Sequence, residues 1–206
     1  MTARPARAIL WMREDGYGCE FCEVALGGTR LDARGVAVAV DPLPYRLDYE
    51  LATGEAFVTK SLLVRSSGAA WSRELRLERD ADGTWHLAAE QRGEVDLPRA
   101  GGDAAAFEGA DDCDLGRSPL TNTMPVLRAR LLEGGAAEFL MAWVSAPDLG
   151  VHTSRQRYEF LSRDAAGAVV RYRGSHRGTA YDIEFDADGL VRRYPGLAYR
   201  ACESLL

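Results

Sequence analysis

The sequence predicts a mainly β protein built on one curled antiparallel sheet, a spiral β-roll or partly open barrel with little helix. Three observations indicate this class. Apolar and polar residues alternate with a period of two in many short segments, which is typical of strands with one buried and one solvated face. Turns rich in Asp and Gly separate these segments. Segments with the apolar spacing of a helix are scarce.

The predicted strands can be followed along the chain. Residues 36–40 carry valines on one face and alanines on the other, and residues 46–51 alternate as Arg-Leu-Asp-Tyr-Glu-Leu. The same alternation recurs in residues 155–160 and 181–186. Residues 139–144 are apolar on both faces, which predicts a central strand or a buried wall. We expect about ten to twelve short strands with hairpin spacing.

The turns and the few helical segments complete the predicted architecture. Residues 80–83 and 186–189 both read Asp-Ala-Asp-Gly, and the glycine accepts the positive φ that closes a hairpin. The best helix candidates are short pieces at residues 104–109 and 134–138. Residues 98–109 are rich in Gly and Ala and are predicted to form a loop with room for one helical turn. We expect a single domain over residues 1–206, with the seam between two similar halves near residues 98–110.

Composition excludes several classes of protein. A chain of 206 residues buries a sizeable core without disulfides, and its formal net charge of −6 argues against a general nucleic-acid binder. No apolar run approaches the ~20 residues of a membrane span. The N-terminal residues lack the apolar core of a signal peptide, which predicts a cytoplasmic protein. No cofactor or metal is expected, because Cys19 and Cys22 would point to opposite faces of a strand.

A proline-bracketed segment, residues 118–125 (SPLTNTMP), is the most distinctive polar feature. The residue before a proline is pushed toward extended conformations, so we expect no helix here and a strand over residues 126–131. Asp112 and Asp114 precede the segment, and Arg128 follows it. Two interpretations stay open: a structural corner with ion pairs, and a polar rim that faces a ligand.

Several motifs resemble those of a known family. Residues 112–115 (DCDL), residues 118–125 and Arg128 are similar to the D-x-D-aliphatic, P-F-T-N-T-L-P and arginine pattern of the bacterial "putative glycolipid-binding" family, formerly a domain of unknown function. Leu120 replaces the Phe of that pattern, and Met124 replaces the Leu. The resemblance implies a spiral β-roll similar to that of lipoprotein-localisation factors, which hold acyl chains in a hydrophobic cavity.

The resulting hypothesis is non-catalytic binding of a lipid or glycolipid in an apolar cavity of the curled sheet, with no nucleic-acid partner and no membrane span. An alternative is a hydrolase-like enzyme acting on a lipid or sugar conjugate, with Asp112 and Asp114 as its acid/base pair. A third is a subunit that pairs through a sheet edge. The oligomeric state is not predicted. The candidate ligand-binding residues are Asp112, Asp114, Thr121, Asn122, Thr123, Arg128, Trp85, Trp143 and Tyr158.

Overall fold

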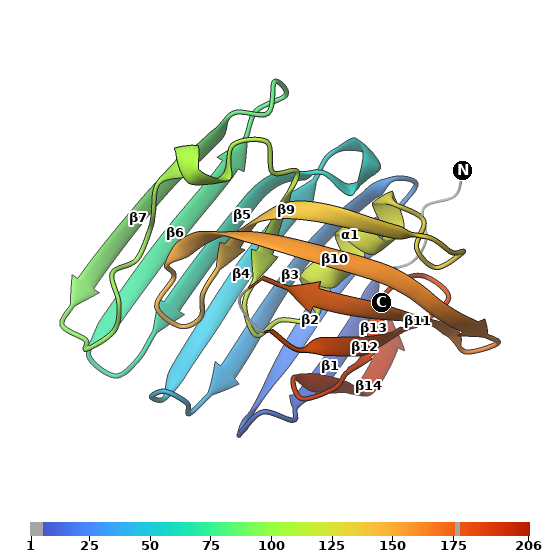
Figure 1. The fold of residues 1–206 in the computed structure, drawn as a ribbon. Helices are drawn as coiled ribbons and strands as arrows, with labels where there is room; N and C mark the ends of the chain where they lie inside the picture. The colour runs from blue at the N-terminus through green and yellow to red at the C-terminus, as the bar shows by residue number, and fades with distance from the viewer. Residues whose placement is uncertain (1–5, 176–177) are drawn as a thin grey trace.

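The computed structural model describes residues 6–175 and 178–206, and it confirms the predicted fold class. Within these residues, fourteen strands form one curled sheet that does not close into a barrel (Figure 1). The strand order is β7-β6-β5-β4-β3-β2-β1-β14-β13-β12-β11-β10-β9-β8, and β8 and β9 form the one parallel pair in the described sheet. The strands are β1 (Arg7–Arg13), β2 (Gly18–Gly27), β3 (Arg30–Ala39), β4 (Tyr45–Thr53), β5 (Thr59–Ser67), β6 (Trp71–Arg79), β7 (Trp85–Gly93), β8 (Asp112–Leu115), β9 (Ala136–Val144), β10 (Val151–Asp164), β11 (Gly167–Gly174), β12 (Ala180–Phe185), β13 (Val191–Tyr194) and β14 (Ala198–Leu205). The helical elements are η1 (Glu55–Phe57), η2 (Ala104–Phe107), η3 (Leu120–Asn122) and α1 (Thr123–Arg128).

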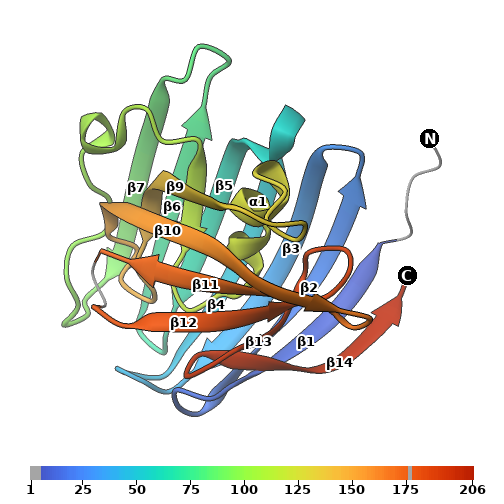
Figure 2. The same cartoon turned by 45° about the vertical axis from the view of Figure 1, so that its right-hand side comes forward.

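The curl brings the two halves of the sheet face to face. Pairing of β1 with β14 joins the halves, and both views place α1 between β9–β10 and the strands β2–β5 (Figures 1 and 2). The edge strand β8 reaches across to β5, where Thr59 N donates to Asp111 O at 2.9 Å and Cys113 N donates to Thr59 Oγ1 at 2.9 Å. The concave side is therefore occupied by β8, η3 and α1.

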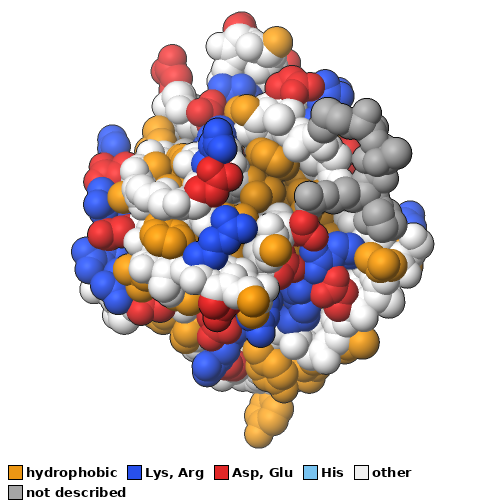
Figure 3. Space-filling view, turned by 90° about the vertical axis from the view of Figure 1, so that its right-hand side faces the viewer, with side chains coloured by type: hydrophobic (Ala, Val, Ile, Leu, Met, Phe, Trp, Pro, Cys, Tyr) orange, Lys and Arg blue, Asp and Glu red, His pale blue; other side chains and the backbone are white. Residues whose placement is uncertain are grey.

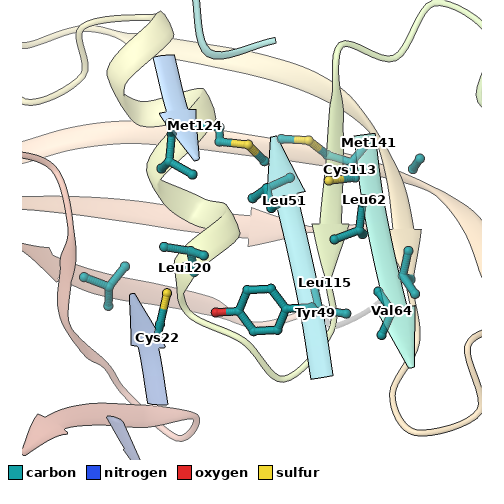
Figure 4. Packing of buried hydrophobic residues seen from close by; sticks show 14 of the residues in the cluster. Cys22, Tyr49, Leu51, Leu62, Val64, Cys113, Leu115, Leu120, Met124 and Met141 are labelled. Atoms are coloured by element: carbon teal, nitrogen blue, oxygen red, sulfur yellow. The ribbon is translucent and has the colours of Figure 1, made fainter. Parts of the chain in front are cut away.

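The core follows from the period-two alternation. In β2, Cys22 and Val24 are buried and face the concave side, whereas Phe21 is exposed. Figure 4 shows Leu51 of β4 near Met124, on the side of the sheet that faces the helical segment. Each fully buried aliphatic or aromatic side chain of this kind contributes about 1.5–3 kcal/mol to the free energy of unfolding.

The prediction that no helix crosses residues 118–125 is wrong. These residues form η3 and then α1, and no strand follows over residues 126–131. Pro125 is the third residue of α1, and the first four N–H groups of a helix have no partner within it. A proline in the first turn therefore removes no helical hydrogen bond, and the restriction on the residue before it is overcome by the burial of Met124 and Val126.

The other local predictions are partly confirmed. Gly83 and Gly189 close the two Asp-Ala-Asp-Gly turns with φ of 96° and 85°. A short helical piece is present at η2, as expected. Residues 134–138 contain no helix, because Gly134 and Gly135 form a turn with positive φ and β9 starts at the next residue. No helix in the described part of the chain has the length and apolar character required to cross a membrane.

A buried arginine connects β6 to the segment that links β7 and β8. The Arg73 guanidinium donates to Pro98 O at 2.5 Å, to Asp148 O at 2.7 Å and to Gln91 Oε1 at 2.9 Å. These acceptors come from three parts of the chain, so one side chain holds the outer strands β6 and β7 to the rest of the molecule.

Replacing this arginine is expected to weaken the fold. The Arg73→Met change keeps much of the apolar stem but leaves two backbone carbonyls without their donor, so we expect a loss of about 3 kcal/mol in the free energy of unfolding. Urea unfolding measures it. Arg76→Met, on the outer face of the same strand, is the matched control and should cost less than about 0.5 kcal/mol. Equal losses in the two variants would contradict this role of Arg73.

Candidate ligand-binding site

The charged residues around the SPLTNTMP segment form a buried ion pair. Asp112 on β8 is fully buried, and Arg128 at the end of α1 donates to both of its carboxylate oxygens, with an Nη1–Oδ1 distance of 2.5 Å. The Arg128 guanidinium also lies 5.1 Å from the centre of the Phe139 ring. Burial raises the pKa of Asp112 to about 6, while Arg128 acts to lower it, so the carboxylate is ionised at pH 7.

The second carboxylate of β8 is engaged by neutral donors. Thr121 Oγ1 donates to Asp114 Oδ1 at 2.8 Å, and Gln156 Nε2 donates to Asp114 Oδ2 at 2.6 Å. These contacts weigh against the alternative in which Asp112 and Asp114 act as an acid/base pair, and that alternative stays a prediction. A general acid must carry and release a proton, and both oxygens of Asp112 are held by a guanidinium instead.

A tyrosine of β10 extends this network to the centre of the segment. The Tyr158 hydroxyl lies 2.9 Å from Asn122 Oδ1 and 2.9 Å from Gln156 Oε1, and its single proton serves one of them at a time. Asn122 Nδ2 donates to Pro119 O at 3.2 Å. The structure thus brings together Asp114, Thr121, Asn122 and Tyr158, all residues singled out from the sequence.

The remaining candidates lie in different surroundings. Trp85 on β7 is buried, and its Nε1 donates to Ala110 O at 2.9 Å. Trp143 on β9 is the register partner of Asp114 and is half-buried, with its ring 5.8 Å from that of His152. Thr123 is fully buried in α1. Direct contact of any of the nine residues with a ligand stays a prediction.

A small cavity lies where the SPLTNTMP segment begins. It has a volume of about 20 Å³ and lies between the inner face of β1–β4 and residues 115–119. Most of its wall is apolar, with Trp11, Tyr45 and Leu47 among the lining residues, and none of the nine candidates borders it. Ser118 Oγ donates to Glu20 Oε1 at 2.8 Å, and both residues line the cavity. The first residue of the segment is thus part of the cavity wall.

Glu20 is positioned by a tyrosine that reaches over a glycine. Tyr49 on β4 donates its hydroxyl to Glu20 Oε1 on β2 at 2.6 Å, across the intervening strand β3. A Cβ on Gly35, the register partner of Tyr49, would overlap the tyrosine ring. Figure 4 shows the Tyr49 hydroxyl pointing toward Cys22, the next inward residue of β2. The missing side chain at position 35 therefore opens the path between Tyr49 and Glu20.

The electrostatics of Glu20 set it apart from the surface carboxylates. Burial raises the pKa of Glu20 to about 7, against the hydrogen bonds from Tyr49 and Ser118 and the positive charge of Arg13, which lower it. Its Oε1 accepts two hydrogen bonds, whereas no group among residues 6–175 and 178–206 donates to the buried Oε2. Glu20, one of the residues that line the cavity, therefore has one buried carboxyl oxygen without a donor among the described residues.

Sequence reasoning missed Glu20, although a signal was present. Cys22, Val24 and Leu26 mark the buried face of one strand, and the same period of two places Glu20 on that face. A carboxylate at an inward position of a strand is unusual, because an ionised group is seldom fully buried without a partner. The contact with Ser118 could not be found in this way, since 98 positions separate the two residues.

The described residues contain no group of three or more His, Cys, Asp or Glu side chains that could hold a metal ion. Cys22 and Cys113 are buried, and burial raises the pKa of both thiols, that of Cys113 to about 12. These two thiols are therefore protonated at neutral pH.

The comparisons with known proteins establish the family. The family model described as "Putative glycolipid-binding" matches residues 8–200. The chain belongs to this family. The crystal structure of a DUF1089 family protein from Pseudomonas aeruginosa is 30% identical, with a TM-score of 0.67 over 88% of this chain and 91% of that one.

A second solved structure shares the fold. The beta-barrel-like protein of domain of unknown function DUF1849 from Brucella abortus aligns over 98% of both chains with a TM-score of 0.52 and 7% identity. At this identity the likeness concerns the fold alone. No curated protein matched the sequence.

The buried carboxylate predicts an unusual dependence of stability on pH. The pKa of Glu20 is about 7 in the folded protein, against 4.5 for a glutamate in water, so the folded state holds the proton more tightly than the unfolded chain. Stability from this group is present below pH 4.5 and is lost as the pH rises through 7. We expect Glu20→Gln to raise the free energy of unfolding by about 3 kcal/mol at pH 8 and by about 1 kcal/mol at pH 5.

Urea unfolding at the two pH values measures this difference. Glu23→Gln is the matched control for the loss of a carboxylate, because Glu23 lies on the outer face of the same strand. A Glu20→Gln variant whose effect is the same at pH 5 and pH 8 would show that the carboxylate is not held in this environment.

The glycine under Tyr49 gives a further prediction. Gly35→Ala should displace the Tyr49 ring and cost about 2 kcal/mol in urea unfolding. The matched control is Gly27→Ala on β2, where an added Cβ meets no atom within 4 Å. If the two alanine variants are equally stable, Tyr49 does not depend on the space at position 35.

Proposed function

We propose that this protein binds a lipid or glycolipid without converting it, and that one polar group of the headgroup enters the cavity lined by Glu20 and Ser118. The observation that carries the proposal is the combination of an apolar wall with a buried carboxylate oxygen that lacks a partner among the described residues. An amphiphilic molecule combines the two matching features, because its headgroup carries hydrogen-bonding groups and the rest of the molecule is apolar. Membership in a family described as "Putative glycolipid-binding" supports a ligand of this class.

The size of the cavity decides which part of the ligand it accepts. A volume of about 20 Å³ is room for about one water-sized group. The concave side of the sheet is otherwise filled by a continuous hydrophobic core that includes Leu120, Met124 and Met141. An acyl chain is far larger than this cavity, so we assign one polar group of the headgroup, and not the chain, to the cavity.

Exposed apolar side chains near the cavity offer a place for the rest of the ligand. Tyr17 is 84% exposed in the loop between β1 and β2, and Val38 and Val40 are exposed at the end of β3. This is the end of the strands that carries Arg13 and Tyr45 of the cavity wall. Figure 3 shows hydrophobic side chains gathered toward the lower end of one face of the molecule. We propose that the acyl portion lies along this surface.

We assign a supporting role, and no catalytic one, to the carboxylates of β8. Asp112 serves as the partner of Arg128, and Asp114 accepts from Thr121 and Gln156. We assign these residues to the support of the SPLTNTMP segment, which in turn places Ser118 at the cavity.

Titration with defined amphiphiles tests the proposal. Trp11 lines the cavity, so ligand entry should change the intrinsic tryptophan fluorescence in a saturable manner with one ligand per protein. The probes are sodium decanoate, dihexanoyl phosphatidylcholine and n-octyl-β-D-glucoside, each below its micelle concentration. N-acetyltryptophanamide corrects for effects of the amphiphile on free indole. The absence of a saturable response to all three would contradict a lipid-binding role.

A further inference from the structure

The outer face of the sheet carries an apolar surface where the two halves join. Four neighbouring strands each place two apolar side chains there, in two rows that follow the register: Val38, Cys19, Met12 and Tyr199 in one row, and Val36, Phe21, Leu10 and Cys202 in the other. We call these eight residues the outer patch. Phe21 is 41% exposed, Val38 45% and Tyr199 43%. A contiguous apolar surface of this kind marks an interaction site in a soluble protein.

Each row of the outer patch ends on a charged side chain of β4. Arg46 is the register partner of Val38, and Asp48 is the register partner of Val36. Within β4, Arg46 Nη2 donates to Asp48 Oδ1 at 2.6 Å. A hollow of about 500 Å³ lies on the same face, and Phe21, Val36 and both charged residues line it. The surface therefore combines an apolar centre, room for incoming side chains and a rim with charges of both signs.

We propose that the outer patch is the interface of a symmetric dimer, in which a second copy of this chain covers it. A two-fold axis that runs across the strands, midway between the rows, places each row of one copy over the other row of its partner. Arg46 then faces the partner's Asp48, and Asp48 faces the partner's Arg46. In the apolar centre the large Phe21 faces the small side chain of the partner's Cys19. The surface is thus complementary to itself in charge and in size.

The dimensions of the surface fit a dimer of modest affinity. The five strands from β4 to β14 span about 24 Å, and the two rows with one flanking row on each side span about 27 Å, which gives about 600 Å² per copy. Specific interfaces begin at about 600 Å² per partner. Two sheets that pack face to face keep their strands within about 30° of each other, as this axis requires. We therefore expect a dissociation constant in the micromolar range.

A membrane surface suits the outer patch less well. Exposed carboxylates of Glu14, Asp15 and Asp41 lie at the strand ends beside it, and the chain has a formal net charge of −6. Anionic headgroups repel such groups. The paired charges of Arg46 and Asp48 would also meet no fixed counterpart in a bilayer, whereas a second copy supplies one. The charges of the rim thus favour a protein partner with the same pattern.

Exchange of the two rim charges tests the two-fold arrangement. Sedimentation equilibrium, from micromolar to millimolar protein, measures the dissociation constant of the dimer. Arg46→Asp places a carboxylate opposite the partner's Asp48, so it should weaken the dimer at least tenfold. Combining Arg46→Asp with Asp48→Arg restores opposite charges across the axis, and this double variant should dimerise within threefold of the unmodified protein.

Two controls match the changes in the outer patch. Arg171→Asp breaks a similar surface ion pair on β11, where Arg171 Nε donates to Asp182 Oδ1 at 2.7 Å, and it should change the dissociation constant less than twofold. Phe21→Ser removes the largest apolar contact of the hollow and should weaken the dimer at least tenfold. Leu161→Ser, which changes an exposed apolar side chain of β10, should have an effect of less than twofold.

The outcomes decide whether a second copy covers this face. An unmodified protein that stays monomeric up to millimolar concentration would overturn the proposal, as would a double variant no tighter than Arg46→Asp alone or an unchanged dimer in Phe21→Ser. A monomer that floats with phosphatidylcholine vesicles would also overturn it and assign the outer patch to a lipid surface. The inference goes beyond the proposed function and does not depend on it, because the cavity lies on the inner face of the same strands.

Discussion

The buried ion pair between Asp112 and Arg128 is the interaction on which the central segment depends. It joins the edge strand β8 to the end of α1, and everything between these two points lies inside the curl of the sheet. Removing two charges from water is costly, and a bidentate geometry is what offsets that cost. The face of Phe139 under the guanidinium adds a second favourable contact. The pair thereby fixes the end of α1 against the start of β8, and it closes the segment that fills the concave side into a loop.

A chain of hydrogen bonds leads from this support to the cavity. Thr121 is held by Asp114, Asn122 lies against Tyr158, and Ser118 reaches Glu20. These contacts hold the segment in place, so that one serine and the backbone of residues 115–119 lie over β2 and β4.

Much of the fold could be predicted because strands and turns depend on residues that are close together in the sequence. The alternation in residues 46–51 and 181–186 predicted strands, and Gly83 and Gly189 close the turns that their sequence indicated. The helix at α1 was missed for a physical reason. The restriction before a proline is a preference of about the size that burial of one or two apolar side chains can overcome, and Met124 and Val126 are fully buried.

The candidate site also combines features that local sequence rules predict with features that depend on the tertiary structure. The sequence by itself determined which residues face inward on each strand, including Glu20, since a period of two assigns every side chain to one face. It also marked the SPLTNTMP segment as distinctive. Only the tertiary structure decided that Ser118 meets Glu20, that Tyr49 passes over Gly35, and that Arg128 neutralises Asp112. Alternation fixes the face of a strand but not the curvature of a sheet, and it is the curvature that brings distant strands together around the cavity.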